Sequence, residues 1–183
     1  MLSAVEPSDD ALRGAAPTLA GAYGEPHNAT MMGHFEAFTP EEVVEHYEEL
    51  LAEGGHAFLL HVDGALVGDG DLRGVDRAGR TAELAIMLAT QSTQGRGLGT
   101  RFALMLHAFA FRVLELDRLY VSILPGNTAS QRLFAKLGYR EDLSPAARTL
   151  VDDEDELTLS VERAAFEQAH REALASIRIE RVD

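Results

Sequence analysis

The sequence predicts one mixed α/β domain, in which a mostly antiparallel sheet of about six to seven strands carries helices on both faces. Short β-rich runs separated by turns fill residues 56–89, which indicates successive antiparallel strands in a meander. Beyond residue 97 the period changes, and apolar residues recur at helical spacing. Helical and β-rich segments then alternate as far as residue 161, which adds further helices and strands to the same sheet.

Helices are expected on either side of a loop before the first of these strands. Residues 8–22 are rich in alanine and begin at Ser8, a good N-cap, and Pro17 should break or kink this helix. Residues 21–33 are rich in Gly, Pro, His and Asn, which is typical of a loop. A capping threonine, a proline and two acids then predict a helix over residues 39–53.

Turn signals and helical spacing place the remaining elements. Asp63-Gly64 is a strong hairpin signal, and Gly138 stands where a glycine commonly ends a helix. The expected strands cover residues 56–62, 65–75, 80–89 and 119–124, with two more near 139–143 and 156–161, and the expected helices cover 98–114 and 127–137.

The last residues extend beyond the expected final strand. We therefore divide the chain into a domain over residues 1–162 and an extension over residues 163–183. Apolar spacing predicts a helix in this extension, followed by a short edge strand through Ile177 and Ile179. Such an addition could form a homodimer contact or cover an edge of its own domain.

The composition limits the function classes. The chain has 183 residues, of which 46% are hydrophobic, and it has no cysteine, which excludes disulfides, thiol nucleophiles and thiolate metal ligands. Its formal net charge of −14 should repel nucleic acid and attract a cationic substrate, although acidity alone also aids solubility. No long apolar run and no signal-peptide pattern is present, which predicts a soluble cytoplasmic protein without membrane contact.

The strongest chemical signal is the segment Gln94-Gly95-Arg96-Gly97-Leu98-Gly99-Thr100. Alternating glycines before a helix let backbone N–H groups turn toward one point, and with the helix dipole they form an anion site for phosphate. A dinucleotide-binding fingerprint would need a glycine where Thr100 or Phe102 stands, and a P-loop would need a Gly-Lys-Ser/Thr ending. The spacing therefore excludes both of these nucleotide sites.

Three motifs together resemble the GNAT superfamily of N-acetyltransferases. Gln94-x-x-Gly97-x-Gly99 matches that family's pyrophosphate signature, and the run from Ala82 to Leu88 resembles the strand that leads into it. The run from Asn127 to Tyr139 resembles the second family motif, which ends in a Gly-aromatic pair. The three cover about residues 80–143 in the right order. The Asn-x-x-Ser arrangement is closest in style to the branch that acetylates the N-termini of ribosomal proteins.

The resemblance implies acetyl-CoA as the acyl donor and assigns residues to it. In such proteins the strand before the loop splays from its neighbour, and its backbone would bond the pantetheine arm at Met87, Leu88 and Ala89. The pyrophosphate would be held by backbone N–H groups of the glycine loop, and Asn127 would bond the pantetheine region or cap its helix. The cofactor-binding residues implied in the loop are Gln94, Gly95, Arg96, Gly97, Leu98, Gly99 and Thr100.

The catalytic residues are less determined by the resemblance. Many family members use a tyrosine to protonate the departing thiolate, but Phe134 stands at that position. The related branch implies Ser130 as the acid instead. Glu83 is the candidate base for the amine, acting directly or through water, although an exposed strand glutamate is an equally good interpretation. Positioning of amine and thioester could also supply much of the rate without a dedicated base.

Three functions remain open at this point. The favoured one is N-acetylation of a primary amine, either a small molecule or a protein N-terminus, with transfer of a bulkier acyl group and non-catalytic acyl-CoA binding as alternatives. No histidine pattern indicates a metal site. The acidic run at residues 152–156 is interpreted as a solvated hairpin, or less favourably as an attraction for a cationic acceptor.

Overall fold

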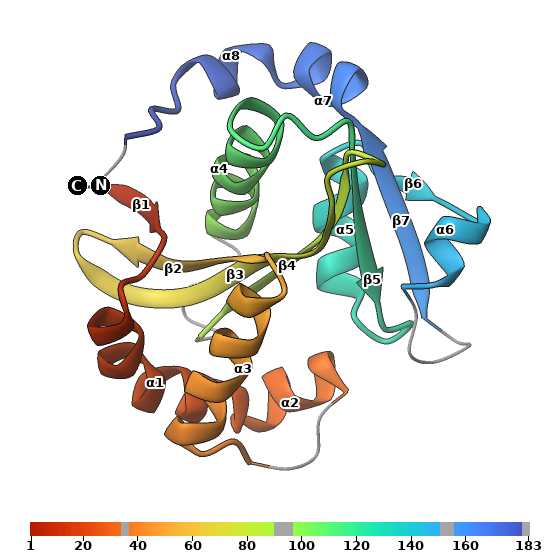
Figure 1. The fold of residues 1–183 in the computed structure, drawn as a ribbon. Helices are drawn as coiled ribbons and strands as arrows, with labels where there is room; N and C mark the ends of the chain where they lie inside the picture. The colour runs from red at the N-terminus through yellow and green to blue at the C-terminus, as the bar shows by residue number, and fades with distance from the viewer. Residues whose placement is uncertain (34–36, 90–96, 151–155, 181–183) are drawn as a thin grey trace.

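The computed structural model describes residues 1–33, 37–89, 97–150 and 156–180, and these form one seven-stranded sheet in the order β1-β2-β3-β4-β5-β7-β6 (Figure 1). Helices lie on both faces of this sheet, so the expected fold class is confirmed. The strands are β1 (Leu2–Val5), β2 (His56–Val62), β3 (Ala65–Asp76), β4 (Thr81–Leu88), β5 (Arg118–Ile123), β6 (Arg140–Glu141) and β7 (Leu157–Glu162). The helices are α1 (Asp9–Tyr23), α2 (Pro26–Met32), α3 (Pro40–Ala52), α4 (Leu98–Arg112), α5 (Thr128–Lys136), α6 (Pro145–Arg148), α7 (Arg163–Ala169) and α8 (Arg171–Ala175).

The first helix begins as expected but does not end at its proline. Ser8 caps α1 by accepting a hydrogen bond from the backbone N–H of Ala11, and the helix continues through Pro17 to Tyr23. Pro17 is exposed, whereas Leu12 and Leu19 are buried in the apolar layer between α1 and α3. The expected break is wrong because this packing outweighs the single backbone hydrogen bond that a proline removes.

The expected loop at residues 21–33 is also wrong, because α2 lies within it. The Glu25 carboxylate accepts hydrogen bonds from the backbone N–H groups of His27 and Asn28 at 3.0 and 3.2 Å. Pro26 occupies the first turn, where its missing N–H costs nothing, and Gly33 ends the helix at φ 74°. The helix expected over residues 39–53 is confirmed as α3, which starts with a capping box between Thr39 and Glu42.

Strands β2, β3 and β4 form the expected antiparallel meander. Asp63 and Gly64 make the β2–β3 turn with φ values of 50° and 81°, the positive values of the turn type that such a sequence favours. Strand β1 was not expected, and it pairs with β2 at one edge of the sheet. Four residues are too few to show a reliable alternating pattern.

The pairing between β4 and β5 stops early. These two strands are parallel and pair only from Thr81–Glu83 to Arg118–Tyr120, whereas β4 stays paired with β3 as far as Leu88. The last part of β4 therefore diverges from β5, as the splay of the central strands in Figure 1 shows. The splay inferred from the family resemblance is thus present.

The C-terminal helices pack into the main core. Phe166 in α7 and Leu174 in α8 are 1% and 2% exposed and belong to the same apolar cluster as α4. The ring of His107 stacks on Phe166 at 4.1 Å, and its Nε2 lies 2.8 Å from the Tyr139 hydroxyl. Burial lowers the pKa of His107 to about 3, so its imidazole is neutral at physiological pH.

Residues 177–180 do not form the edge strand expected after these helices. The side chain of Ile177 instead packs against the main core, so it is partly buried without belonging to a strand. Within the described ranges, no helix is both long and apolar enough to span a bilayer.

Truncating Phe166 tests whether the C-terminal helices support the core. Phe166→Ala should lower the free energy of unfolding by about 3–5 kcal/mol, because it removes a fully buried ring. Ile179→Ala, which truncates a residue that is 42% exposed on the same segment, is the control and should cost less than about 1 kcal/mol. Equal urea midpoints for the two variants would show that the segment does not contribute to the core.

Candidate functional site

A pocket of about 360 Å³ joins the diverging end of β4 to three helices. It contains most of the residues that the sequence assigned to the donor, namely Met87, Leu88, Gly97, Leu98, Gly99, Thr100 and Asn127, together with Ser130. Ala89 and Glu83 are not part of its lining, and Gln94, Gly95 and Arg96 lie outside the described residues. The sequence did not foresee the other lining residues: His27, Asn28, Met31, Met32, Ile86, Ala129, Arg132, Leu133 and Lys136.

The first turn of α4 presents backbone donors at this pocket that have no intrahelical acceptor. Gly97 stands at the N-cap with φ 74°, and no side chain caps the helix. The backbone N–H of Arg101 makes the first helical bond, to the Gly97 carbonyl at 3.1 Å. The N–H groups of the preceding helical residues have no intrahelical acceptor, and the helix dipole adds positive potential there. This arrangement suits an anionic group such as a phosphate.

The end of β4 offers backbone groups on its open side. The Ala89 N–H donates to the Val67 carbonyl at 2.8 Å, and the Ala89 carbonyl accepts from the Asn28 side chain at 3.3 Å. Along an antiparallel strand, the backbone N–H and C=O groups of successive residues point alternately toward the partner strand and away from it. Because Ala89 bonds to β3, the N–H and C=O of Leu88 point away from β3, toward the side where β5 has diverged. Leu88 is therefore better placed than Ala89 to bond a ligand in the opening.

Two asparagines hold α2 against the pocket. The Asn28 amide donates to the carbonyl oxygens of Ala22 and Ala89, which ties α2 to the ends of α1 and β4. The Asn127 amide donates to the Met31 carbonyl at 3.2 Å, while its oxygen accepts from the backbone N–H of Ser130 at 3.0 Å. Asn127 therefore caps α5 as expected and also links α5 to α2.

Ser130 and Phe134 occupy different environments on α5. Ser130 lines the pocket, and its hydroxyl makes no hydrogen bond with the described residues. Phe134 is 3% exposed and packs edge-on against Tyr139 with ring centroids 5.0 Å apart. A hydroxyl added at Phe134 would enter the core, so this structure offers Ser130 rather than position 134 to the pocket.

Arg132 and Lys136 bring positive charge to the same pocket. They are four residues apart on α5 and therefore share a helix face with Ala129 and Leu133. Two cations beside a candidate anion site are unusual in a chain with a net charge of −14, and they support the binding of a negatively charged ligand there. Their spacing of four residues within the second motif is the sequence signal that could have predicted them.

Glu83 lies on β4 below the pocket, on the same strand face as Met87. Burial is the largest influence on its carboxyl and raises the pKa, while Arg73 opposes the rise through its charge and Ser122 through hydrogen bonds. Four residues separate Glu83 from Met87, which is about 13 Å along a strand. A group beside Met87 is therefore beyond direct contact with Glu83, which would be reached through water or by an acceptor amine that extends toward it.

The buried carboxylate of Asp69 holds helices α1 and α3 against the same sheet face. The hydroxyls of Tyr23 in α1 and Tyr47 in α3 both donate to Oδ2 of Asp69 in β3. Oδ1 of Asp69 has no partner among the described residues, and burial raises the pKa of this carboxyl to about 6. Because α2 follows directly after Tyr23, this contact also helps to position the α2 wall of the pocket.

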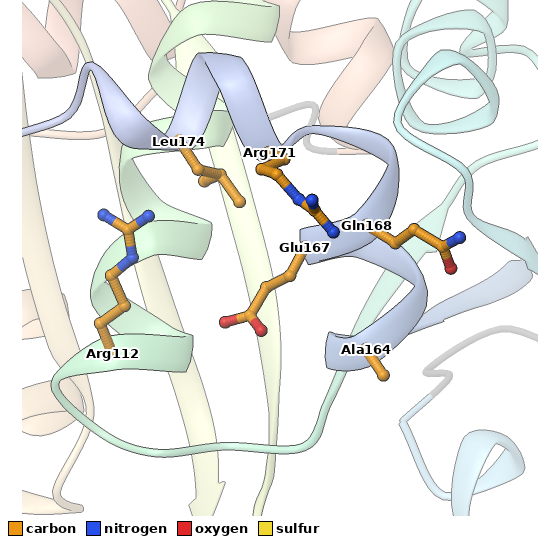
Figure 2. A pocket seen from close by; sticks show the side chains of 6 residues that line it. All are labelled: Arg112, Ala164, Glu167, Gln168, Arg171 and Leu174. Atoms are coloured by element: carbon orange, nitrogen blue, oxygen red, sulfur yellow. The ribbon is translucent and has the colours of Figure 1, made fainter.

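A second pocket, of about 570 Å³, lies between α4 and the C-terminal helices (Figure 2). In the figure Arg112 projects from α4 on one side, and Glu167 and Arg171 lie opposite on α7 and α8. Glu167 already accepts a hydrogen bond from Arg163 at 3.0 Å. None of the residues predicted for the donor or for catalysis lies here. Its lining consists of Arg112, Ala164, Glu167, Gln168, Arg171 and Leu174.

No cluster of three potential metal-binding side chains exists within residues 1–33, 37–89, 97–150 and 156–180. Of the histidines considered from the sequence, His56 pairs with Glu6 at 2.7 Å and His27 lines the first pocket from α2.

The chain matches the family model described as "Acetyltransferase (GNAT) domain" over residues 2–140. It is 29% identical over 119 residues to the spermidine N(1)-acetyltransferase of Escherichia coli K12, covering 62% of each protein. It is 33% identical over 89 residues to the putative ribosomal N-acetyltransferase YdaF of Bacillus subtilis, covering 49% of this chain and 48% of that protein. The structure of Mycobacterium smegmatis RimJ in complex with CoA-disulfide superposes with a TM-score of 0.75 at 21% identity, covering 96% of this chain and 88% of that one.

The chain therefore belongs to the GNAT acetyltransferase domain family. The family inferred from the glycine loop and its flanking motifs is confirmed. One of the relatives, described as a putative ribosomal N-acetyltransferase, agrees with the style of the second motif. The match extends over less than two thirds of the length of these curated relatives.

The two glycines of the α4 turn should respond differently to alanine. Gly97→Ala should lower the free energy of unfolding by about 1–2 kcal/mol, because its left-handed φ of 74° is unfavourable for a residue with a Cβ. Gly99→Ala is the matched control: its Cβ would meet only Leu133 and Leu88, at 3.5 and 3.9 Å. Urea denaturation of both variants provides the test. A Gly97→Ala midpoint equal to wild type would show that this backbone conformation is not the one adopted in solution.

Proposed function

We propose that this protein is an acetyl-CoA-dependent N-acetyltransferase that acetylates a primary amine in the cytoplasm. The proposal is carried by one observation: the residues of the first α4 turn, whose N–H groups have no intrahelical acceptor, line the pocket beside the part of β4 that has separated from β5. Membership of the GNAT family supports the same activity.

The pocket residues fit the parts of the donor. Backbone donors of Leu98, Gly99 and Thr100 would hold the pyrophosphate, and the sequence adds the neighbouring Gln94, Gly95 and Arg96 to this loop. The cationic side chains of Arg132 and Lys136 would balance the phosphate charge. The backbone groups of Leu88 would bond the pantetheine amides, with Met87 and Asn127 beside them.

Glu83 and Ser130 would handle the protons of the transfer. The bound donor supplies an acetyl thioester. Glu83 takes a proton from the protonated amine, directly or through water, so that the nitrogen can form its bond to the acetyl carbon as the carbon–sulfur bond breaks. Ser130 lies in the donor pocket, and its hydroxyl has no hydrogen-bond partner among the described residues. It would give its proton to the departing thiolate and would regain one from the second proton that the nitrogen releases as the amide forms. The raised pKa of Glu83 makes it a better proton acceptor than an ordinary exposed carboxylate.

A cationic amine suits the charges near this site. Asp71 and Glu83 lie on adjacent strands of the sheet face below the pocket, and the chain as a whole is strongly acidic. The relatives include a spermidine acetyltransferase and a putative ribosomal one, so small polyamines and protein N-termini are the two acceptor classes to compare. Transfer rates with acetyl-, propionyl- and succinyl-CoA would test which acyl group is preferred. Transfer rates with a panel of amines would test which acceptor is preferred.

Coenzyme A should bind and stabilise the folded protein. At about 100 times its dissociation constant, CoA should add roughly 2.7 kcal/mol to the free energy of unfolding, a shift that thermal melts would detect. Gly99→Val should abolish this gain, because its side chain would point toward Leu133 and Leu88 inside the pocket. Gly14→Val, which changes an exposed helical glycine with open space around it, is the control. Stabilisation by NAD or ATP in place of CoA would refute the proposed donor.

Acid–base roles should separate kinetically. Ser130→Ala should lower kcat by roughly 10²–10⁴-fold with little change in acetyl-CoA affinity, because a general acid acts in the transition state. Glu83→Gln should lower the rate and remove the acid limb of the pH profile, since the carboxyl that must lose its proton on that limb is gone. A Ser130→Ala defect confined to acetyl-CoA affinity would make the serine a donor contact. Unchanged rates in both variants would leave positioning as the source of catalysis.

A further inference from the structure

Charged side chains on β3 and β4 lie side by side on the sheet face below α1 and α3. Residues Asp69, Asp71 and Arg73 alternate along β3, and Arg73 stands directly opposite Glu83 on β4. Asp71 also pairs with Ala57 of β2, which belongs to the apolar layer beneath α1 and α3. Arg73 is thus the cross-strand neighbour of the proposed base.

We infer that Arg73, held by Asp71, is a positioning residue that keeps the Glu83 carboxylate ionised and oriented for the acceptor amine. This inference rests on the proposed function, because it assumes that Glu83 is the base that deprotonates the amine. Neither Arg73 nor Asp71 lines the donor pocket, so neither would touch acetyl-CoA there.

The geometry of the Asp71–Arg73 pair is suited to this role. Nε of Arg73 donates to Oδ1 of Asp71 at 2.7 Å, and a terminal guanidinium nitrogen donates to Oδ2 at 2.7 Å. The Asp71 side chain is only 6% exposed, whereas that of Arg73 is 41% exposed. A bidentate pair anchored on a buried carboxylate restricts the arginine to one place while leaving part of its guanidinium accessible. A flexible surface arginine would not provide a charge at a fixed distance from Glu83.

Each charged or polar group facing Glu83 can be assigned an effect. From β3, the Arg73 charge favours the ionised carboxylate and the Asp71 charge disfavours it. From β5, hydrogen bonding by Ser122 favours the ionised carboxylate, and Tyr120 is the register partner of Glu83. The next cation on that strand, Arg118, is already bound to Glu162 and Asp142. Tyr47 of α3 is neutral, since burial raises the pKa of its hydroxyl. Within the part of the chain that the structure describes, Arg73 is therefore the cation available to Glu83.

These signs predict opposite effects for the two partners. Replacing Arg73 by a neutral residue removes a favourable charge, so the pKa of Glu83 should rise further. Replacing Asp71 by asparagine removes an unfavourable charge beside Glu83, so the pKa of Glu83 should fall. A purely structural role for the pair would damage both variants in the same way, with no shift of opposite sign.

The experiment follows the Glu83 carboxyl by carbon NMR titration in the full chain, assigned by its loss in Glu83→Gln. Arg73→Met should move the titration midpoint to higher pH, Asp71→Asn should move it to lower pH, and Arg73→Lys should stay close to wild type because the charge is retained. Arg13→Met, which removes an arginine from the exposed Arg13–Glu48 pair, is the control and should not move it. With acetyl-CoA and spermidine as the probe amine, kcat/KM of Arg73→Met should fall roughly tenfold on the acid limb and change little at high pH.

Unmoved midpoints in both Arg73→Met and Asp71→Asn, or shifts of the same sign, would overturn the inference. Loss of rate that is equal at every pH would do the same, because it would indicate a folding defect. A Glu83→Gln variant with wild-type turnover over an amine panel would instead remove Glu83 as the base. In that case the mechanism under the proposed function fails, whatever the titrations show.

Discussion

The rest of the structure depends on where β4 stops pairing with β5. After Glu83 the two parallel strands separate, while β4 remains bound to β3 up to Leu88. Among the described residues, this divergence leaves the Leu88 backbone without a strand partner on one side. The N–H groups of the first α4 turn, which have no intrahelical acceptor, lie in the same pocket. Backbone groups exposed in this way are satisfied by water or by a ligand. The same interruption thus creates the opening and presents backbone groups that suit an extended polar ligand such as a pantetheine arm.

The surrounding residues hold this opening in shape from two directions. Asn28 and Asn127 connect α2 to β4 and α5 through side-chain amides. Below the sheet, Tyr23 and Tyr47 bind Asp69 and so fix the helices that carry α2. The face toward α4 and α5 is apolar and tightly packed, whereas the face with Glu83 carries buried charges. The proposed base Glu83 therefore lies on the sheet face opposite to α4.

Much of the fold followed from local chemistry in the sequence. The capping box at Thr39, the Asp63-Gly64 turn and Gly138 each satisfy nearby backbone groups, so their positions were predictable. Helix α2 differs from the expected loop because residues 21–33 have a loop-like composition, whereas Glu25 and Gly33 cap the two ends of a short helix within them. The α2 wall of the pocket and the Tyr23–Asp69 contact join residues far apart in the chain, and no local pattern specifies such partners. The cofactor loop was recognised from its glycines, whereas the acid–base roles still rest on Ser130 and Glu83 as proposals.

The central claim is that the α4 turn and the end of β4 together hold coenzyme A. A crystal structure of the protein grown with CoA tests it most directly. The account predicts the pyrophosphate within hydrogen-bonding distance of the N–H groups of Leu98, Gly99 and Thr100, with the pantetheine arm along Leu88 and the sulfur near Ser130. CoA bound elsewhere, such as between Arg112 and Arg171, with the α4 turn making no contact to phosphate, would contradict it.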